Sequence, residues 1–111
     1  MSIMLRQLCS DAETKYNLRL VAGREGMDNT VRWVHMVEDR QVPDFLHGNE
    51  LVFTTGIGHV GMDPLLEFVK RLKKHNASGV VVNIGPYLSE IPSEVIDYCN
   101  SEKFPLFTLP W

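Results

Sequence analysis

The second half of the chain alternates short apolar runs with amphipathic segments, and this alternation limits the fold more than any other feature. Residues 51–55 have the length of a strand, and residues 79–84 form a near-continuous apolar run, as expected for a strand buried on both faces. A last apolar run follows at 106–109. Strands that are separated by helices imply a parallel sheet with right-handed crossovers.

Two helices are predicted between these strands. The first begins at Asp63-Pro64, with Asp63 as the N-cap and Pro64 at the first helical position. Its apolar side chains fall on one face: Leu65, Phe68, Val69 and Leu72. The basic residues at 70–75 fall at its end, where cations complement the helix macrodipole. The second helix begins at Pro92, and its inward side chains are Val95, Ile96 and Cys99.

The first half of the chain is less regular. The helical spacing of apolar residues predicts a short helix at 3–9, with Ser2 as its cap. Residues 18–22 are predicted to form a strand, and residues 23–29 form a turn region with Gly, Asp and Asn. Residues 31–37 are rich in residues that favour strands, and we predict that they form the next strand, antiparallel to the first.

These elements together predict one α/β domain over residues 1–111, with a mixed, mostly parallel sheet of about five strands flanked by helices. A length of 111 residues suits one domain, and a hydrophobic content of 44% is ordinary for a globular core. The sequence ends on Pro110-Trp111, directly after a predicted strand, whereas complete chains more often end in polar residues. We therefore expect a fragment of a longer protein.

Composition and charge argue against several classes of function. A net charge of -3 gives no electrostatic footprint for nucleic acid, so DNA binding would need another domain. No apolar run approaches the roughly 20 residues that cross a bilayer, and the start lacks the pattern of a signal peptide. Cys9 and Cys99 are lone cysteines within apolar patterns, which predicts buried, reduced thiols. These observations favour a cytoplasmic protein without a membrane partner.

The glycines at 56–61 have the spacing of a dinucleotide-binding loop and follow a strand. In a true loop of this kind the helix begins within the glycines, so that its N–H groups meet the pyrophosphate. Here the helix begins later, at Asp63, whose carboxylate would repel a phosphate. The next strand ends at Asn83-Ile84-Gly85 rather than at the acid that binds the ribose. We therefore predict no cofactor and interpret the run as a flexible loop beside a ligand crevice.

Metal and catalytic sites are not predicted either. The four histidines lack the spacing of a metal site: His35, His47, His59 and His75. Serine, histidine and carboxylate residues all occur, but no nucleophile motif such as Gly-x-Ser-x-Gly is present in the sequence. The sequence therefore predicts a domain that binds a partner without catalysing a reaction.

The candidate ligand site is predicted from the topology. Ligands of open parallel sheets bind outside the carboxyl ends of the strands, where Thr54 and Thr55 follow one strand and Asn83 follows the next. Hydroxyls, an amide and bare glycine backbone suit a small polar ligand, although the two threonines could instead satisfy local backbone groups. An aromatic ring at the crevice edge could stack on a flat ligand or pack in the core. The candidate residues are Trp33, Glu38, Thr54, Thr55, Gly56 and Asn83.

Several blocks of sequence carry a family resemblance over nearly the whole chain. They include Val31-Arg32-Trp33-Val34-His35 with Glu38, Thr54-Thr55-Gly56, Gly79-Val80-Val81 and Pro110-Trp111. In these blocks the chain resembles the N-terminal domain of the purine catabolism regulator (PucR-like) family of bacterial transcription factors. Two positions depart from the family pattern, since Val37 replaces the usual serine and Gly48-Asn49 replaces a frequent pair of glycines.

The resemblance implies a regulatory module at the head of a longer chain. In that family a C-terminal helix-turn-helix region binds DNA, and the N-terminal domain is thought to sense a small molecule. Some family members regulate purine breakdown, whereas many others control other pathways. We therefore expect a small-molecule effector, DNA contact only through the missing C-terminal domain, and no catalytic activity in this domain.

Two other functions stay open. A fainter similarity runs to the uridine-nucleotide-binding N-terminal domains of Mur ligases, and it rests in part on the Gly-Val-Val-Val strand. It would make the chain the nucleotide- or substrate-binding domain of a larger enzyme. Alternatively, the chain is a dimerisation module without a ligand, in which an exposed apolar patch forms a symmetric homodimer interface.

Overall fold

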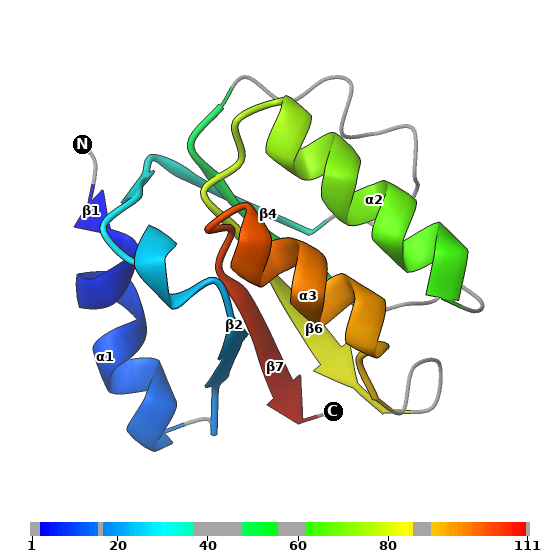
Figure 1. The fold of residues 1–111 in the computed structure, drawn as a ribbon. Coiled ribbons are helices and arrows are strands. Elements are labelled where there is room, and N and C mark those ends of the chain that lie inside the picture. Colours follow the sequence, from blue (N-terminus) through cyan, green and yellow to red (C-terminus); the bar gives the residue numbers. More distant parts are fainter. Residues whose placement is uncertain (1–2, 16, 37–47, 56–61, 86–89, 111) are drawn as a thin grey trace.

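The computed structural model describes residues 3–15, 17–36, 48–55, 62–85 and 90–110, with the backbone alone for 11–15 and 62–64. The helices are α1 (Leu5–Lys15), α2 (Met62–Lys74) and α3 (Ser93–Ser101). They flank a central five-stranded sheet, beside which lies a small two-stranded sheet. Figure 1 shows α2 and α3 side by side over one face of the central sheet, while α1 packs against the other face.

The central sheet is mixed and mostly parallel, which confirms the predicted α/β class. Its strands follow the order β2-β7-β6-β5-β4. Their bounds are β2 Arg19–Ala22, β4 Trp33–Met36, β5 Glu50–Thr54, β6 Gly79–Ile84 and β7 Leu106–Pro110. The strands β4, β5, β6 and β7 run parallel, whereas β2 pairs antiparallel with β7. The helix α2 connects β5 to β6 and α3 connects β6 to β7, so the predicted strand-helix alternation is confirmed.

The strand β6 lies at the centre of the sheet and is buried on both faces. Val80 and Val82 pack with α2 and α3, while Val81 packs on the face of α1, because successive side chains of a strand point to opposite faces. The core on the α2 and α3 face includes Val52, Leu65, Phe68, Val69, Leu72, Val95 and Cys99. The core on the α1 face includes Leu5, Cys9, Leu18, Met27, Leu51 and Phe107.

The start of α2 differs from the prediction by a few residues. Met62 is the first helical residue, so Asp63 and Pro64 both lie in the first turn, and Asp63 is not the residue before the helix. Proline is tolerated there because the first N–H groups of a helix have no acceptor within it. The helix α3 begins at Ser93, one residue after the predicted start at Pro92, which is the N-cap.

The N-terminal helix does not cover its predicted range of 3–9. Ile3–Met4 forms the short strand β1, which pairs antiparallel with β3 (Thr30–Val31), and α1 follows from Leu5 to Lys15. The register joins Ile3 to Val31. Local periodicity carries no information about a partner this far along the chain, so the strand was predicted as the first turn of the helix.

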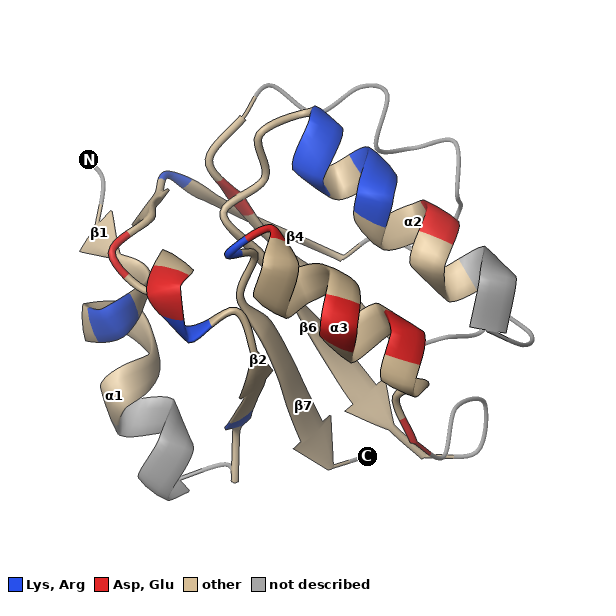
Figure 2. Cartoon of the chain, in the orientation of Figure 1, with Lys and Arg blue, Asp and Glu red and all other residues tan. Residues whose placement is uncertain are grey.

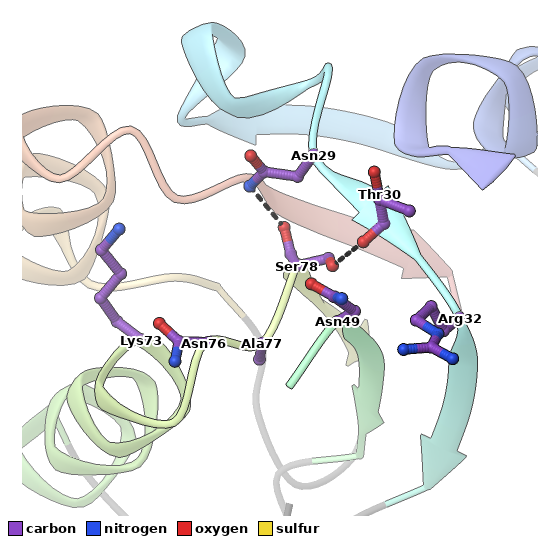
Figure 3. Close-up of a pocket in the computed structure, with 8 residues that line it drawn as sticks. All are labelled: Asn29, Thr30, Arg32, Asn49, Lys73, Asn76, Ala77 and Ser78. Atoms are coloured by element: carbon purple, nitrogen blue, oxygen red, sulfur yellow. Dashed lines mark hydrogen bonds between the residues drawn. The ribbon is translucent and has the colours of Figure 1, made fainter. Parts of the chain in front are cut away.

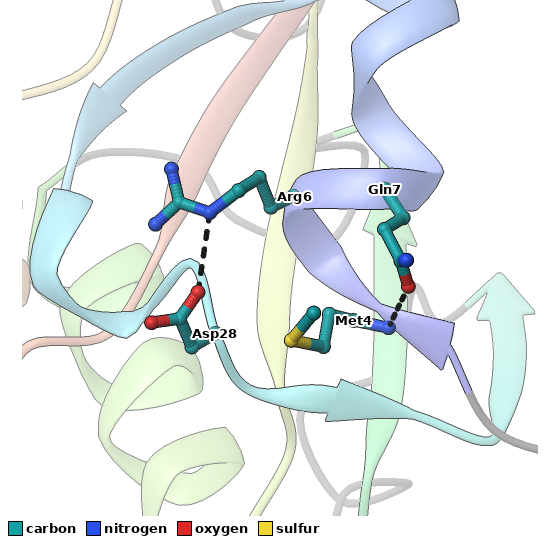
Figure 4. Close-up of polar contacts among 4 residues, drawn as sticks. All are labelled: Met4, Arg6, Gln7 and Asp28. Carbon is teal, nitrogen blue, oxygen red and sulfur yellow. Dashed lines mark hydrogen bonds and ion pairs between the residues drawn. The ribbon is translucent and has the colours of Figure 1, made fainter.

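Polar contacts hold the start of α1 (Figure 4). The backbone N–H of Met4 donates to Oε1 of Gln7 at 3.3 Å, a contact that satisfies one N–H before the first helical turn. The predicted cap, Ser2, lies outside the described residues. The Arg6 guanidinium donates to Oδ1 of Asp28 at 3.1 Å. Because both of these side chains are largely exposed, this ion pair contributes less than about 1 kcal/mol.

The predicted strand at 31–37 is divided, and its predicted pairing is wrong. The strand β3 ends at Val31 and β4 begins at Trp33; between them, the Arg32 N–H donates to the carbonyl oxygen of Asn49 at 2.8 Å. The strand β4 pairs parallel with β5 at one edge of the sheet, whereas β2 lies at the other edge. The place beside β2 belongs to β7, from the far end of the chain, which is why sequence neighbours do not pair here.

Two glycines with positive φ give a matched test of the fold. A Cβ on Gly23 (φ 74°) would lie 2.1 Å from the carbonyl oxygen of Phe104, whereas a Cβ on Gly48 (φ 104°) would meet nothing closer than Asn76 at 3.7 Å. We expect Gly23→Ala to lower the free energy of unfolding by at least about 3 kcal/mol and Gly48→Ala by about 1 kcal/mol, because only the first adds a backbone clash to the strain. Urea denaturation measures both, and equal losses would contradict this description.

Both cysteines are buried thiols outside any disulfide, as predicted, and they lie on opposite faces of the sheet. Burial raises the pKa of the Cys99 thiol from its ordinary 9.0 to about 12. The physical cause is that the thiolate would lose its hydration inside the core. Burial also raises the pKa of the neighbouring Tyr98, with smaller contributions from Glu102 and Cys99.

The raised pKa of Cys99 predicts a loss of stability at high pH. Between pH 9.0 and about 12 the unfolded chain releases the thiol proton while the folded chain keeps it, so the free energy of unfolding falls as the pH rises through this window. Tyr98 adds to the same slope. Denaturation of the wild type and of Cys99→Ala across this range should therefore show a shallower slope for the variant, and identical slopes would refute the assignment.

Candidate functional site

An apolar hollow opens on the α1 face of the central sheet. It has a volume of about 320 Å³, within the range of pockets that hold small molecules. The described residues that line it are all apolar: Leu8, Cys9, Leu18, Val34, Leu51, Phe53, Val81 and Leu109. The helix α1 forms one wall and four strands form the floor. Because Val34 on the edge strand is 56% exposed, the hollow opens toward β4.

Polar groups lie at the carboxyl end of this floor. Asn83 on β6 is in register with Leu109 on β7, and neighbouring residues of a sheet share a face, so its amide lies at the rim of the hollow. Thr54 is in register with Val82, so Thr55 follows beside Asn83. The alternation that turns Phe53 toward the hollow places Thr55 on the same face, and both Thr55 and Asn83 are half-buried.

The structure separates two of the predicted site residues from this rim. Thr54 is fully buried, and the alternation along β5 places it on the face of α2 and α3 with Val52. Trp33 is 54% exposed and in register with Glu50 at the amino end of β5, four residues before Thr54. That separation is roughly 13 Å along the strand. An indole there does not reach a ligand held by Asn83.

Two further predicted residues, Glu38 and Gly56, lie outside the described residues, as do the glycines at 58 and 61. The helix α2 begins at Met62, after the last glycine of this run, as the sequence indicated. Of the six predicted residues, the structure therefore brings Thr55 and Asn83 together at one rim. The sequence missed the apolar lining, since its members are spread from α1 to β7 and carry no motif.

Basic residues gather at the end of α2 that leads into β6. The last turn of α2 carries Arg71, Lys73 and Lys74, which Figure 2 shows gathered at the end of that helix. A second hollow at the same end of the sheet has a polar lining that includes Lys73 and Arg32. The sequence did not predict this second hollow. Topology predicts ligands only at the carboxyl ends of the strands, and the basic residues were interpreted as a solvated helix end.

Two other kinds of site are absent from the part of the chain that the structure describes. Within the described ranges, no group of three or more His, Cys, Asp or Glu side chains is arranged to hold a metal ion. Within the same ranges, no helix has both the length and the apolar character needed to cross a lipid bilayer.

Two comparisons with known proteins find relatives of this chain. A family model described as the purine catabolism regulatory protein-like family matches residues 7–111. The purine catabolism regulatory protein of Bacillus subtilis (strain 168) is 35% identical over 96 residues, which amounts to 85% of this chain and 18% of that protein. The chain thus spans a small part of the length of this curated relative.

Proposed function

Because the chain belongs to the purine catabolism regulatory protein-like family, we propose that it is the small-molecule-sensing domain of a longer transcription regulator. The effector is a purine or a purine breakdown product, since the name of the Bacillus subtilis relative refers to purine catabolism. The domain acts in the cytoplasm by binding rather than by catalysis. DNA is bound by a helix-turn-helix region elsewhere in the longer protein, in keeping with the net charge of -3 on this chain.

The apolar hollow with its polar rim is the observation that carries this proposal. A flat heterocycle has two apolar faces and an edge of hydrogen-bonding groups. The apolar walls suit the faces, and the Asn83 amide offers both donors and an acceptor to the edge. The Thr55 side chain lies next to the amide at the same rim. The described residues of this lining include no cation for a nucleotide phosphate, which favours a nucleobase over the uridine nucleotide of a Mur-ligase-like enzyme.

The proposal is tested by thermal unfolding with a panel of purines and their breakdown products. A ligand present at a hundredfold its dissociation constant adds about 2.7 kcal/mol to the free energy of unfolding, which raises the melting temperature of a domain of this size by roughly 10 °C. We expect one or more members of the panel to give this shift in a concentration-dependent manner. A panel without any shift would remove the purine effector.

Three variants locate the effector within the fold. Asn83→Ala and Thr55→Val each remove a polar group from the rim, and each should weaken binding by about tenfold, the effect of one lost hydrogen bond. Thr54→Val is the matched control, because this neighbour faces α2 and α3. It should change stability but leave the dissociation constant within about twofold. A greater loss of affinity in Thr54→Val than in Thr55→Val would contradict the assignment.

A second candidate function, homodimerisation, is favoured by the exposed strand β4. It is the last strand in the order of the central sheet, and its side chains are all exposed. They include Trp33 at 54%, Val34 at 56% and Met36 at 64%. Apolar side chains on a sheet edge are a template for pairing with another chain. Two copies of β4 related by a two-fold axis would extend the sheet across a symmetric interface.

Met36→Lys tests this second function. A lysine on the edge strand would leave the fold intact, because position 36 is exposed, but it would place like charges across a two-fold interface. Sedimentation should show a dimer for the wild type that dissociates at least about tenfold more readily in the variant. Ile3→Lys, an exposed apolar position on the small sheet, is the control and should dimerise as the wild type does. A monomeric wild type at high concentration would rule the dimer out.

A further inference from the structure

A second hollow opens at the amino ends of β5 and β6, at the opposite end of the sheet from Asn83 (Figure 3). It has a volume of about 530 Å³, and Ala77 is the one apolar residue among the described residues that line it. Its walls come from three connections: the segment that leads into β4, the turn before β5, and the link from α2 to β6. The proposed effector site uses none of these residues, so this hollow needs a separate explanation.

Two cations line the hollow from different elements. Arg32 precedes β4 and Lys73 lies in the last turn of α2, and Figure 3 shows them on opposite sides of the group. Within the part of the chain that the structure describes, neither side chain has an ion pair. Two nearby acids that the structure describes are engaged: Glu50 is 1% exposed and accepts the Gly48 N–H at 2.9 Å, and Asp28 pairs with an arginine of α1.

Backbone hydrogen bonds fix the walls relative to one another. The Asn49 N–H donates to the carbonyl of Asn76 at 2.8 Å, and the Ser78 N–H donates to the carbonyl of Glu50 at 2.7 Å. The Arg32 N–H donates to the carbonyl of Asn49 at 2.8 Å. These bonds join all three connections, so the hollow is assembled before any ligand arrives. A preorganised site binds more tightly because less ordering accompanies binding.

Asparagine amides and hydroxyls complete the lining. Nδ2 of Asn29 donates to the carbonyl oxygen of Ser78 at 3.1 Å, and the Ser78 hydroxyl donates to the carbonyl oxygen of Thr30, so this wall is internally satisfied. Asn49 and Asn76 have φ values of 67° and 63° in their turns, and their side-chain amides add N–H donors to the lining. The described side chains that remain for a ligand are therefore two cations and two amides, and each amide has N–H donors and one acceptor oxygen.

Among the residues that the structure describes, the electrostatic balance of the hollow is positive. The carboxyl end of α2 contributes a partial charge of about -0.5, whereas Arg32 and Lys73 carry full positive charges that outweigh it. Guanidinium groups bind carboxylates and phosphates in a bidentate manner. We propose that this hollow binds an oxyanion, the carboxylate or phosphate group of a small polar molecule, with Arg32 and Lys73 as the cations on its two sides and the amides of Asn49 and Asn76 as further donors.

The test follows the backbone amides of the chain by NMR while inorganic phosphate or malonate is added at constant ionic strength. For one or both probes, the amide signals of Arg32, Asn49, Asn76 and Ser78 should shift to saturation. The probe that binds more tightly identifies the group as a phosphate or a carboxylate. If neither probe gives a saturable shift at these residues, the proposal is overturned.

The double variant Arg32→Gln/Lys73→Gln distinguishes specific binding in the hollow from non-specific attraction to surface charge. The double variant should fold, because neither side chain belongs to the core. The dissociation constant of the probe that binds more tightly should rise by at least about tenfold. Lys74→Gln is the matched control, since Lys74 is the exposed neighbour that does not line the hollow, and it should leave the constant within about twofold. Equal weakening in both variants, or no weakening in the double variant, overturns the proposal.

The oxyanion site is independent of the proposed effector site, and one further variant shows this. Asn83 lies at the other end of β6, so the Asn83→Ala variant should bind phosphate or malonate as the wild type does. A loss of oxyanion binding in Asn83→Ala would place the anion at the effector rim and overturn the second site. Failure of the purine panel, by contrast, leaves the oxyanion result unaffected.

Discussion

The burial of β6 on both faces is the constraint on which the rest of the structure depends. Val80, Val81 and Val82 are fully buried between two apolar layers, so a slip of one residue would exchange the side chains of the two layers and cost several kcal/mol. The fixed register with β5 and β7 in turn fixes both ends of the strand. Asn83 lies at the apolar hollow, and Ser78 lies at the polar one. The two hollows are thus positioned by the same core.

Much of the second half of the fold could be predicted because its signals are local. The apolar run at 79–84 and the helical face formed by Leu65, Phe68, Val69 and Leu72 each report burial through their own spacing. The first half was predicted less well because its pairings are distant. Ile3 pairs with Val31, and Arg19 pairs with Thr108. The spacing of apolar residues around Ile3 or Arg19 does not indicate either partner. The sequence around Arg32 likewise gave no sign that the strand predicted at 31–37 would divide there.

The candidate site could be predicted only in part, for a related reason. Topology placed Thr55 and Asn83 at one edge of the sheet, because carboxyl ends of parallel strands meet there. Topology could not show on which face of the sheet a side chain lies. The predicted site therefore included Thr54, which faces α2 and α3, and Trp33, which lies at the amino end of the strands. The apolar lining is assembled by tertiary packing from Leu8 to Leu109 and has no sequence signature. The asparagines of the second hollow are indistinguishable in sequence from ordinary turn residues.

A purine-like effector in the apolar hollow on the α1 face would lie against the methyl groups that line it. Intermolecular NOEs between the ring protons of a bound purine and the methyl groups of the chain measure this directly. We expect contacts to Val34, Val81 and Leu109, which line the hollow, and none to Val80 or Val82 on the other face. Contacts confined to the methyl groups of the α2 and α3 face, or to the amino end of the sheet, would contradict this placement of the effector.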